Sequence, residues 1–156
     1  MANFLFTSCA TQCPIIVSEV KRIQNALLLR ENFRIVSITV DPDRDTPEIL
    51  SAYADRVGAD PFKWIFLTGQ KKNIQSLVQN GFRLSAADEG GTLGADVIHS
   101  SKLVLVDHLG RIRGYYDANE SGEVRQAIKD AKYLLKKTFE LPSQKVAAVP
   151  AIGTRN

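Results

Sequence analysis

The chain has 156 residues, of which 44% are hydrophobic and 24% charged, a balance typical of one globular domain with a sizeable core. Twenty Lys and Arg against 17 Asp and Glu give a net charge of +3, and these basic residues form no stripe, which argues against a nucleic-acid partner. No apolar run approaches the roughly 18 to 20 residues that cross a bilayer. The first residues also lack the basic start of a secretory signal.

The first 29 residues predict a strand, a tight loop and a helix. Residues 2–8 form a short apolar segment typical of a buried strand. Pro14 suits the first turn of a helix, because the N–H that proline lacks would have no partner there. Over residues 15–29 the apolar side chains recur at helical spacing. They are Ile16, Val20, Ile23 and Leu27.

A second strand and helix follow, separated by an acidic turn. Residues 34–40 are rich in β-branched side chains and predict a strand. Residues 41–45 read Asp-Pro-Asp-Arg-Asp, a composition typical of a turn. Thr46 followed by proline and glutamate predicts a helix start, so a helix is expected over residues 47–57, with Gly58 at its end.

The remaining pattern predicts a third strand and helix, a β-hairpin and a closing amphipathic helix. The expected ranges are 64–68, 70–80 (stopped by Gly81), 102–107, 111–116 and 120–137. Strands that alternate with helices indicate an α/β fold of the thioredoxin-like type, with a mainly parallel central sheet flanked by helices and a late hairpin. We expect one domain over residues 1–140 and a flexible tail over 141–156.

Cys9 and Cys13 are the only cysteines, and they lie in the expected loop just before a helix start. Helix N-termini offer unpaired N–H groups and a favourable dipole, which stabilise thiolates. Positions four apart allow both sulfurs to reach one ion. Two soft sulfurs suit Cu(I), and an imidazole nitrogen completes a three-coordinate site that Cu(II) can also use with a fourth donor.

Other roles for the cysteine pair stay open at this point. The two side chains could simply pack in the core. They could form a redox dithiol, although thioredoxins have two residues between their cysteines and this chain has three. A zinc site normally takes a fourth protein ligand, and no further cysteine exists. A peroxidase is a weaker alternative, because no arginine is evidently placed to activate a peroxide.

The chain offers two histidines as a nitrogen ligand, His99 and His108. His108 falls at the tip of the expected hairpin, where side chains are normally exposed to solvent. His99 follows the glycine-rich residues 90–94 and precedes a predicted core strand. A loop of this kind can carry a ligand and still move, but spacing alone does not decide between the two.

Three segments in order, residues 4–14, 36–47 and 99–101, resemble the Sco/SenC family, and the similarity extends over about residues 2–137. The resemblance implies a thioredoxin-like fold in which Cys9, Cys13 and His99 bind copper as Cu(I) or Cu(II). Asp41 matches a family position near the metal, although a plain role as a turn residue explains it equally well.

The resemblance implies a copper metallochaperone that assists assembly of the binuclear copper centre in subunit II of cytochrome c oxidase. The alternative is a thiol-disulfide oxidoreductase in which Cys9 and Cys13 keep client cysteines reduced. The implied partners are that subunit, and also another copper chaperone or a thioredoxin-like reductase. Enzymatic activity would be limited to the reductase reaction.

Family members carry an upstream membrane anchor or signal, facing the periplasm or the intermembrane space, and two or three further strands. This chain begins at the segment that follows them. Either Met1 is internal to a longer protein, or the chain is a shortened variant whose central strand has lost a neighbour. In the second case we expect an uncovered sheet edge, which invites pairing with another chain.

Overall fold

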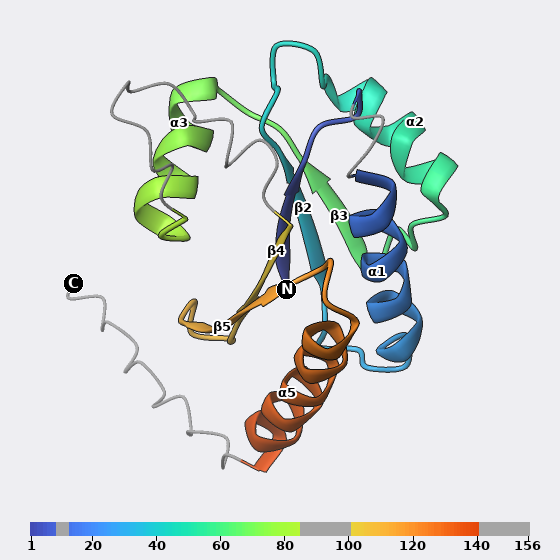
Figure 1. The fold of residues 1–156 in the computed structure, drawn as a ribbon, viewed down its shortest axis with the longest axis vertical. Helices are drawn as coiled ribbons and strands as arrows, with labels where there is room; N and C mark the ends of the chain where they lie inside the picture. Colours follow the sequence, from blue (N-terminus) through green and yellow to red (C-terminus); the bar gives the residue numbers. More distant parts are fainter. Residues whose placement is uncertain (9–12, 85–100, 141–156) are drawn as a thin grey trace, which may run out of the picture.

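The computed structural model describes residues 1–8, 13–84 and 101–140, without the side chains of Cys13 and residues 138–140. The fold is a five-stranded sheet with helices on both faces (Figure 1). Its strands are β1 (Ala2–Leu5), β2 (Ile35–Thr39), β3 (Trp64–Leu67), β4 (Lys102–Val106) and β5 (Ile112–Asp117). The α/β architecture expected from the alternating pattern is confirmed.

The sheet is mixed, with the strand order β3-β2-β1-β4-β5. The pairings β1–β2 and β2–β3 are parallel, whereas β1–β4 and β4–β5 are antiparallel. A mainly parallel sheet was expected, but two of the four strand pairings are antiparallel. Strand β1 has a neighbour on each side, β2 over four residue pairs and β4 at the pair Ala2–Val104, so it is not the edge strand that was expected for a shortened variant.

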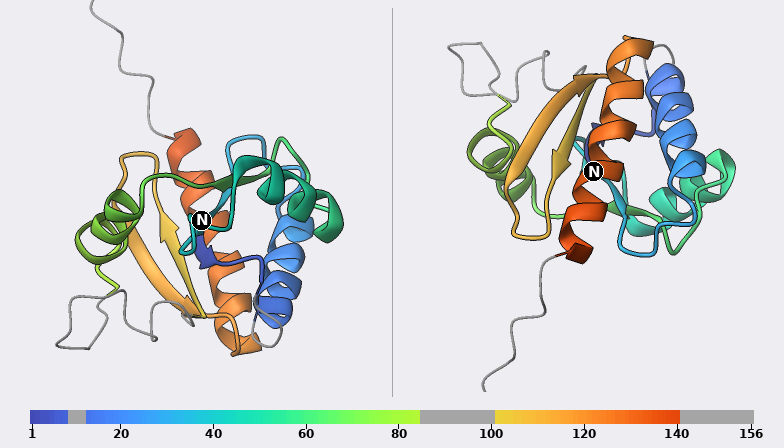
Figure 2. Two further views of the ribbon diagram at one scale, coloured as in Figure 1. Left: turned by 90° about the horizontal axis from the view of Figure 1, so that it is seen from above. Right: turned by 90° about the horizontal axis from the view of Figure 1, so that it is seen from below.

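The helices are α1 (Cys13–Ala26), α2 (Pro47–Val57), α3 (Lys71–Ser76) and α5 (Ser121–Glu140), and α3 continues into a π-helical turn, η1 (Leu77–Gly81). Side chains of α1 and α5 share one core cluster with Trp64 and Leu103, and α2 packs beside them through Leu50 and Tyr53. On the opposite face, α3 and η1 cover Phe4 and Ile38. The views along the sheet separate these layers (Figure 2).

Local signals set most of the element ends. At the start of α2 the Thr46 hydroxyl accepts a hydrogen bond from Ile49 N at 3.4 Å. At its end Gly58 adopts φ 65°, the left-handed conformation that glycine tolerates best. Helix α1 stops at Ala26 rather than near Leu29, because the Arg30 amide turns back to the Leu27 carbonyl.

A buried polar chain crosses the three parallel strands. The indole N–H of Trp64 donates to Ser37 Oγ at 2.7 Å, and Ser37 Oγ donates to Asn3 Oδ1 at 2.7 Å. All three side chains are buried, so a shift of one strand would leave their polar atoms without partners. These two hydrogen bonds favour one strand register in the part of the sheet that carries the site.

No helix in the described ranges is long and apolar enough to cross a membrane.

Candidate functional site

The cysteine motif lies at the carboxyl-terminal ends of the parallel strands. Strand β1 ends at Leu5 and α1 begins at Cys13, so residues 6–12 form the connection, called here the thiol loop. Cys9 lies outside the described residues, and Cys13 is the first residue of α1, with its side chain outside the description. The expected helix is present, but it begins at Cys13 itself, so Cys13 belongs to the first turn of α1 and not to the loop before it.

The acidic loop, residues 41–45, lies at the same edge of the sheet. Strands β1 and β2 run parallel, and Leu5 is in register with Thr39, so the segments that follow these two strands leave the sheet side by side. Figure 1 shows β1 and β2 ending at the side of the sheet where α1 and α2 begin. Ligands and catalytic groups in open α/β sheets commonly gather at such an edge.

The acidic loop is joined to the thiol loop through Asp45. This carboxylate is 1% exposed and accepts hydrogen bonds from Thr7 N at 3.1 Å and Thr7 Oγ1 at 2.5 Å. It also accepts one from Thr39 Oγ1 at 2.5 Å. Thr7 precedes Cys9 by two residues, so Asp45 holds the chain where it begins the thiol loop.

Asp41 is positioned by the same network. Its amide donates to Thr39 Oγ1 at 3.0 Å, and its carbonyl accepts from the amides of Arg44 and Asp45. Its carboxylate, 28% exposed, lies 3.6 Å from Arg44 Nη1. Asp41 is therefore a turn residue whose carboxylate is still accessible, and its role as a metal ligand stays a prediction.

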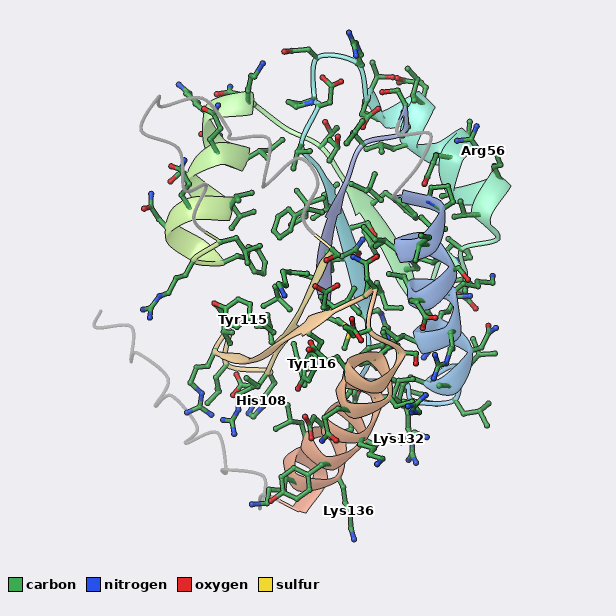
Figure 3. All side chains as sticks on the ribbon, viewed as in Figure 1. Arg56, His108, Tyr115, Tyr116, Lys132 and Lys136 are labelled. Atoms are coloured by element: carbon green, nitrogen blue, oxygen red, sulfur yellow. The ribbon has the colours of Figure 1, made fainter. Side chains whose placement is uncertain are left out.

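The structure describes only one of the two histidines. His99 lies outside the described residues, so its place beside the cysteines stays a prediction. His108 is exposed at the tip of the β4–β5 hairpin, as expected (Figure 3). Because β4 is antiparallel to β1, this tip lies at the end of the sheet opposite the thiol loop. Within the described ranges, no three His, Cys, Asp or Glu side chains are grouped to hold a metal.

A groove of about 460 Å³ borders the thiol loop between α1 and α2. Its lining includes Thr7 and Pro14 on the loop side, together with Tyr53 and Arg56 on α2. The guanidinium of Arg56, which is labelled in Figure 3, lies 4.8 Å from the centroid of the Tyr53 ring. The groove therefore combines an apolar wall with a cation directly beside the cysteine motif.

Sequence reasoning missed both Asp45 and this groove. Asp45 stood out only as part of an acidic turn, because nothing local shows that its partner is Thr7, 38 positions earlier. Arg56 and Tyr53 follow a helical pattern that is equally typical of an ordinary amphipathic helix. Both features require that the segments after β1 and β2 leave the sheet together.

Comparison with known proteins gives a consistent result. The family model described as SCO1/SenC matches residues 1–136. The SCO1 protein homolog of Bacillus subtilis is 30% identical over 134 residues, which cover 85% of this chain and 68% of the relative. A protein of Stutzerimonas stutzeri to which copper binding is ascribed is 38% identical over 119 residues, covering 74% of this chain and 56% of that protein.

Among solved structures, BsSco superimposes with a TM-score of 0.70 at 31% identity, covering 86% of this chain and 78% of that chain. That structure was described for a disulfide switch in a member of the Sco family of cytochrome c oxidase assembly proteins. The present chain spans 56 to 68% of the length of the two relatives above. The family match over residues 1–136, together with the shared fold, establishes that the chain belongs to the SCO1/SenC family.

Proposed function

We propose that this chain binds one copper ion through Cys9, Cys13 and His99 and acts as a metallochaperone in the assembly of cytochrome c oxidase. The observation that carries the proposal is the position of the cysteine pair between the end of β1 and the first residue of α1. The N–H groups and dipole of α1 stabilise thiolates there, and thiolate is the form that binds metal.

The donor set fits copper as a cargo ion. Two thiolates satisfy Cu(I), which is soft and accepts low coordination numbers. Cu(II) gains from an imidazole nitrogen, which we assign to His99, and from a fourth donor. Asp41 is a candidate for that donor, because its main chain is fixed by Thr39 and Asp45 while its carboxylate stays accessible.

Two relatives support this function. Copper binding is ascribed to the Stutzerimonas stutzeri protein, and BsSco belongs to a family of cytochrome c oxidase assembly proteins. We further propose that the client is the binuclear copper centre of subunit II, with that subunit as the partner. The groove between α1 and α2 would then contact a segment of the client next to its copper-binding cysteines.

Anaerobic Cu(I) titration of the reduced chain, followed by X-ray absorption spectroscopy, tests the site. We expect one Cu(I) per chain with two sulfur ligands. Cys9→Ser and Cys13→Ser should each abolish this binding, because one remaining thiolate cannot compete with a strong chelator for Cu(I). Ser8→Ala, next to the motif, is the matched control and should bind as the unmodified chain does. Full Cu(I) retention in either cysteine variant would refute the proposed ligands.

A second function, thiol-disulfide reduction, is favoured by the disulfide switch described for BsSco. In this reaction the two thiols of Cys9 and Cys13 become one disulfide, and two electrons and two protons convert a client disulfide into two thiols. Metal-free protein incubated with a disulfide-bonded peptide should yield the reduced peptide and a Cys9–Cys13 disulfide by mass spectrometry. His99→Ala should keep this activity, which separates it from Cu(II) binding. No peptide reduction by the metal-free chain would exclude the second function.

A further inference from the structure

The end of the molecule opposite the thiol loop presents a surface built from several connections. Three connections meet there: residues 27–34 between α1 and β2, residues 58–63 between α2 and β3, and the hairpin tip at residues 107–111. The last turns of α5 lie beside them (Figure 2, right). We call this surface the far end.

The far end displays the most exposed large hydrophobic side chains of the described residues. These are Leu29 at 92%, Phe62 at 78%, Leu109 at 61% and Tyr133 at 56% exposure. Each belongs to a different one of the elements that meet at this end. A single exposed leucine or phenylalanine is ordinary on a soluble domain, but the four highest exposures at one end indicate an interaction surface.

Contacts show that these elements form one continuous surface. The ammonium of Lys63, next to Phe62, donates to the Arg30 carbonyl at 2.8 Å. A groove of about 780 Å³ is lined by Leu29 and Arg30 together with Tyr133 and its basic neighbours on α5. A second groove, of about 570 Å³, joins His108 of the hairpin tip to Asn32 and Leu135. Three of the four elements thus line the two grooves, which share Glu31, Asn32 and Leu135. The fourth, the 58–63 connection, is joined to them through the Lys63 hydrogen bond.

The surface is also positively charged. Arg30, Lys132 and Lys136 make no ion pair with any described residue, and the Lys63 ammonium has only a carbonyl as its partner. Figure 3 shows Lys132 and Lys136 on the same stretch of α5, reaching away from the sheet. The acids nearby offset part of this charge. Glu31 lines both grooves, Asp60 accepts a hydrogen bond from the Phe62 amide, and Asp107 is already bonded to Arg111.

We propose that the far end docks on the surface of a bilayer that contains anionic phospholipids. Single apolar tips from separate loops, surrounded by lysine and arginine, match an interface in which the tips enter the acyl boundary and the cations meet phosphates. A protein partner would call for a more continuous apolar patch with fewer free cations. Docking in this way turns the thiol loop away from the lipid, and it requires no copper.

Vesicle flotation of the intact chain tests this proposal. We expect the chain to float with vesicles made of equal parts phosphatidylcholine and phosphatidylglycerol, to stay behind with phosphatidylcholine alone, and to be released by high salt. Lys132→Gln/Lys136→Gln should lower the affinity about tenfold or more, because each basic residue near such a surface contributes about 1 kcal/mol. Leu29→Ser/Phe62→Ser should lower it about tenfold by removing apolar area that the lipid buries.

Matched substitutions at the thiol-loop end show whether a loss of flotation is specific to the far end or follows from removing any exposed charge or apolar side chain. Ile49 is exposed in the first turn of α2, and Lys71 and Lys72 are exposed at the start of α3. Ile49→Ser and Lys71→Gln/Lys72→Gln should float as the unmodified chain does. The fluorescence of Trp64, the single tryptophan, verifies that each variant is folded.

Three results would overturn the proposal. The first is failure of the unmodified chain to float with the anionic vesicles. The second is equal loss of flotation in the control variants and the far-end variants. The third is self-association of the lipid-free chain that Leu29→Ser/Phe62→Ser abolishes, because it would identify a second copy of this chain as the occupant.

Discussion

The carboxylate of Asp45 accepts hydrogen bonds from both the amide and the hydroxyl of Thr7, at 3.1 and 2.5 Å. Thr7 lies at the start of the thiol loop, and Asp45 closes the acidic loop that follows β2. The same carboxylate accepts from Thr39, whose hydroxyl oxygen receives the Asp41 amide. One buried side chain therefore sets the relative position of the thiol loop, which contains Cys9, and the acidic loop, which contains Asp41.

Removing the Asp45 carboxylate should destabilise the domain. Asp45→Ala leaves the Thr7 amide and the hydroxyls of Thr7 and Thr39 without their acceptor in a buried place, and we expect a loss of about 2 to 3 kcal/mol in the free energy of unfolding. Urea denaturation followed by Trp64 fluorescence measures this loss. Asp43→Ala, two positions earlier, is the control. Its partner is the exposed Lys71 at 3.0 Å, and such pairs contribute at most about 1 kcal/mol. Equal destabilisation by the two variants would contradict the assigned role.

The two histidines should respond differently to substitution. His99→Ala should weaken Cu(II) binding more than Cu(I) binding, because two thiolates already satisfy the soft monovalent ion while the divalent ion gains from nitrogen. The sulfur-to-copper(II) charge-transfer band measures the first effect, and competition with a Cu(I) chelator measures the second.

His108→Ala is the matched control for this experiment. The structure places His108 at an exposed hairpin tip, at the opposite end of the sheet from the thiol loop, so neither oxidation state should be affected. If the Cu(II) band persisted in His99→Ala, or disappeared in His108→Ala, the choice of His99 as a ligand would be wrong.

Asp107 should make the stability of the hairpin depend on acid. Burial raises the pKa of its carboxyl, but hydrogen bonds from Arg111 and the Leu109 amide outweigh this and lower the pKa to about 2. A group whose pKa is lower in the folded state stabilises the fold above its unfolded pKa of about 3.9. This contribution is lost as the pH falls through the folded pKa, so the free energy of unfolding should decline between about pH 4 and pH 2.

Urea denaturation at a series of pH values measures that decline. Asp107→Asn should make the decline shallower over the same range, because the amide does not titrate. Asp55→Asn, at an exposed position on α2, should leave the slope of the unmodified chain unchanged. A slope that is the same in Asp107→Asn would show that this carboxyl does not stabilise the folded state.

Elements with strong local signals were predicted well, and those that depend on packing were predicted less well. Helix α2 matched at both ends because Thr46 and Gly58 carry the capping signals themselves. Strand β1 is shorter than the expected residues 2–8, because Thr7 leaves the sheet to reach Asp45. The helix expected over residues 70–80 is divided between α3 and η1, where the Phe82 amide reaches back to the Leu77 carbonyl.

The sequence alone was sufficient for the cysteine pair, the helix that follows it and the resemblance that names His99, because all of these are read from local spacing and from motifs. The tertiary structure decided which distant segments meet. Thr7 and Asp45 are 38 positions apart, and they bond because β1 and β2 are parallel neighbours whose following loops leave the same edge. Leu29, Phe62, Leu109 and Tyr133 gather at the other end because their elements turn or end there. Side-chain spacing records which face of a strand or helix is buried, but the order and direction of strands arise only when the whole core packs.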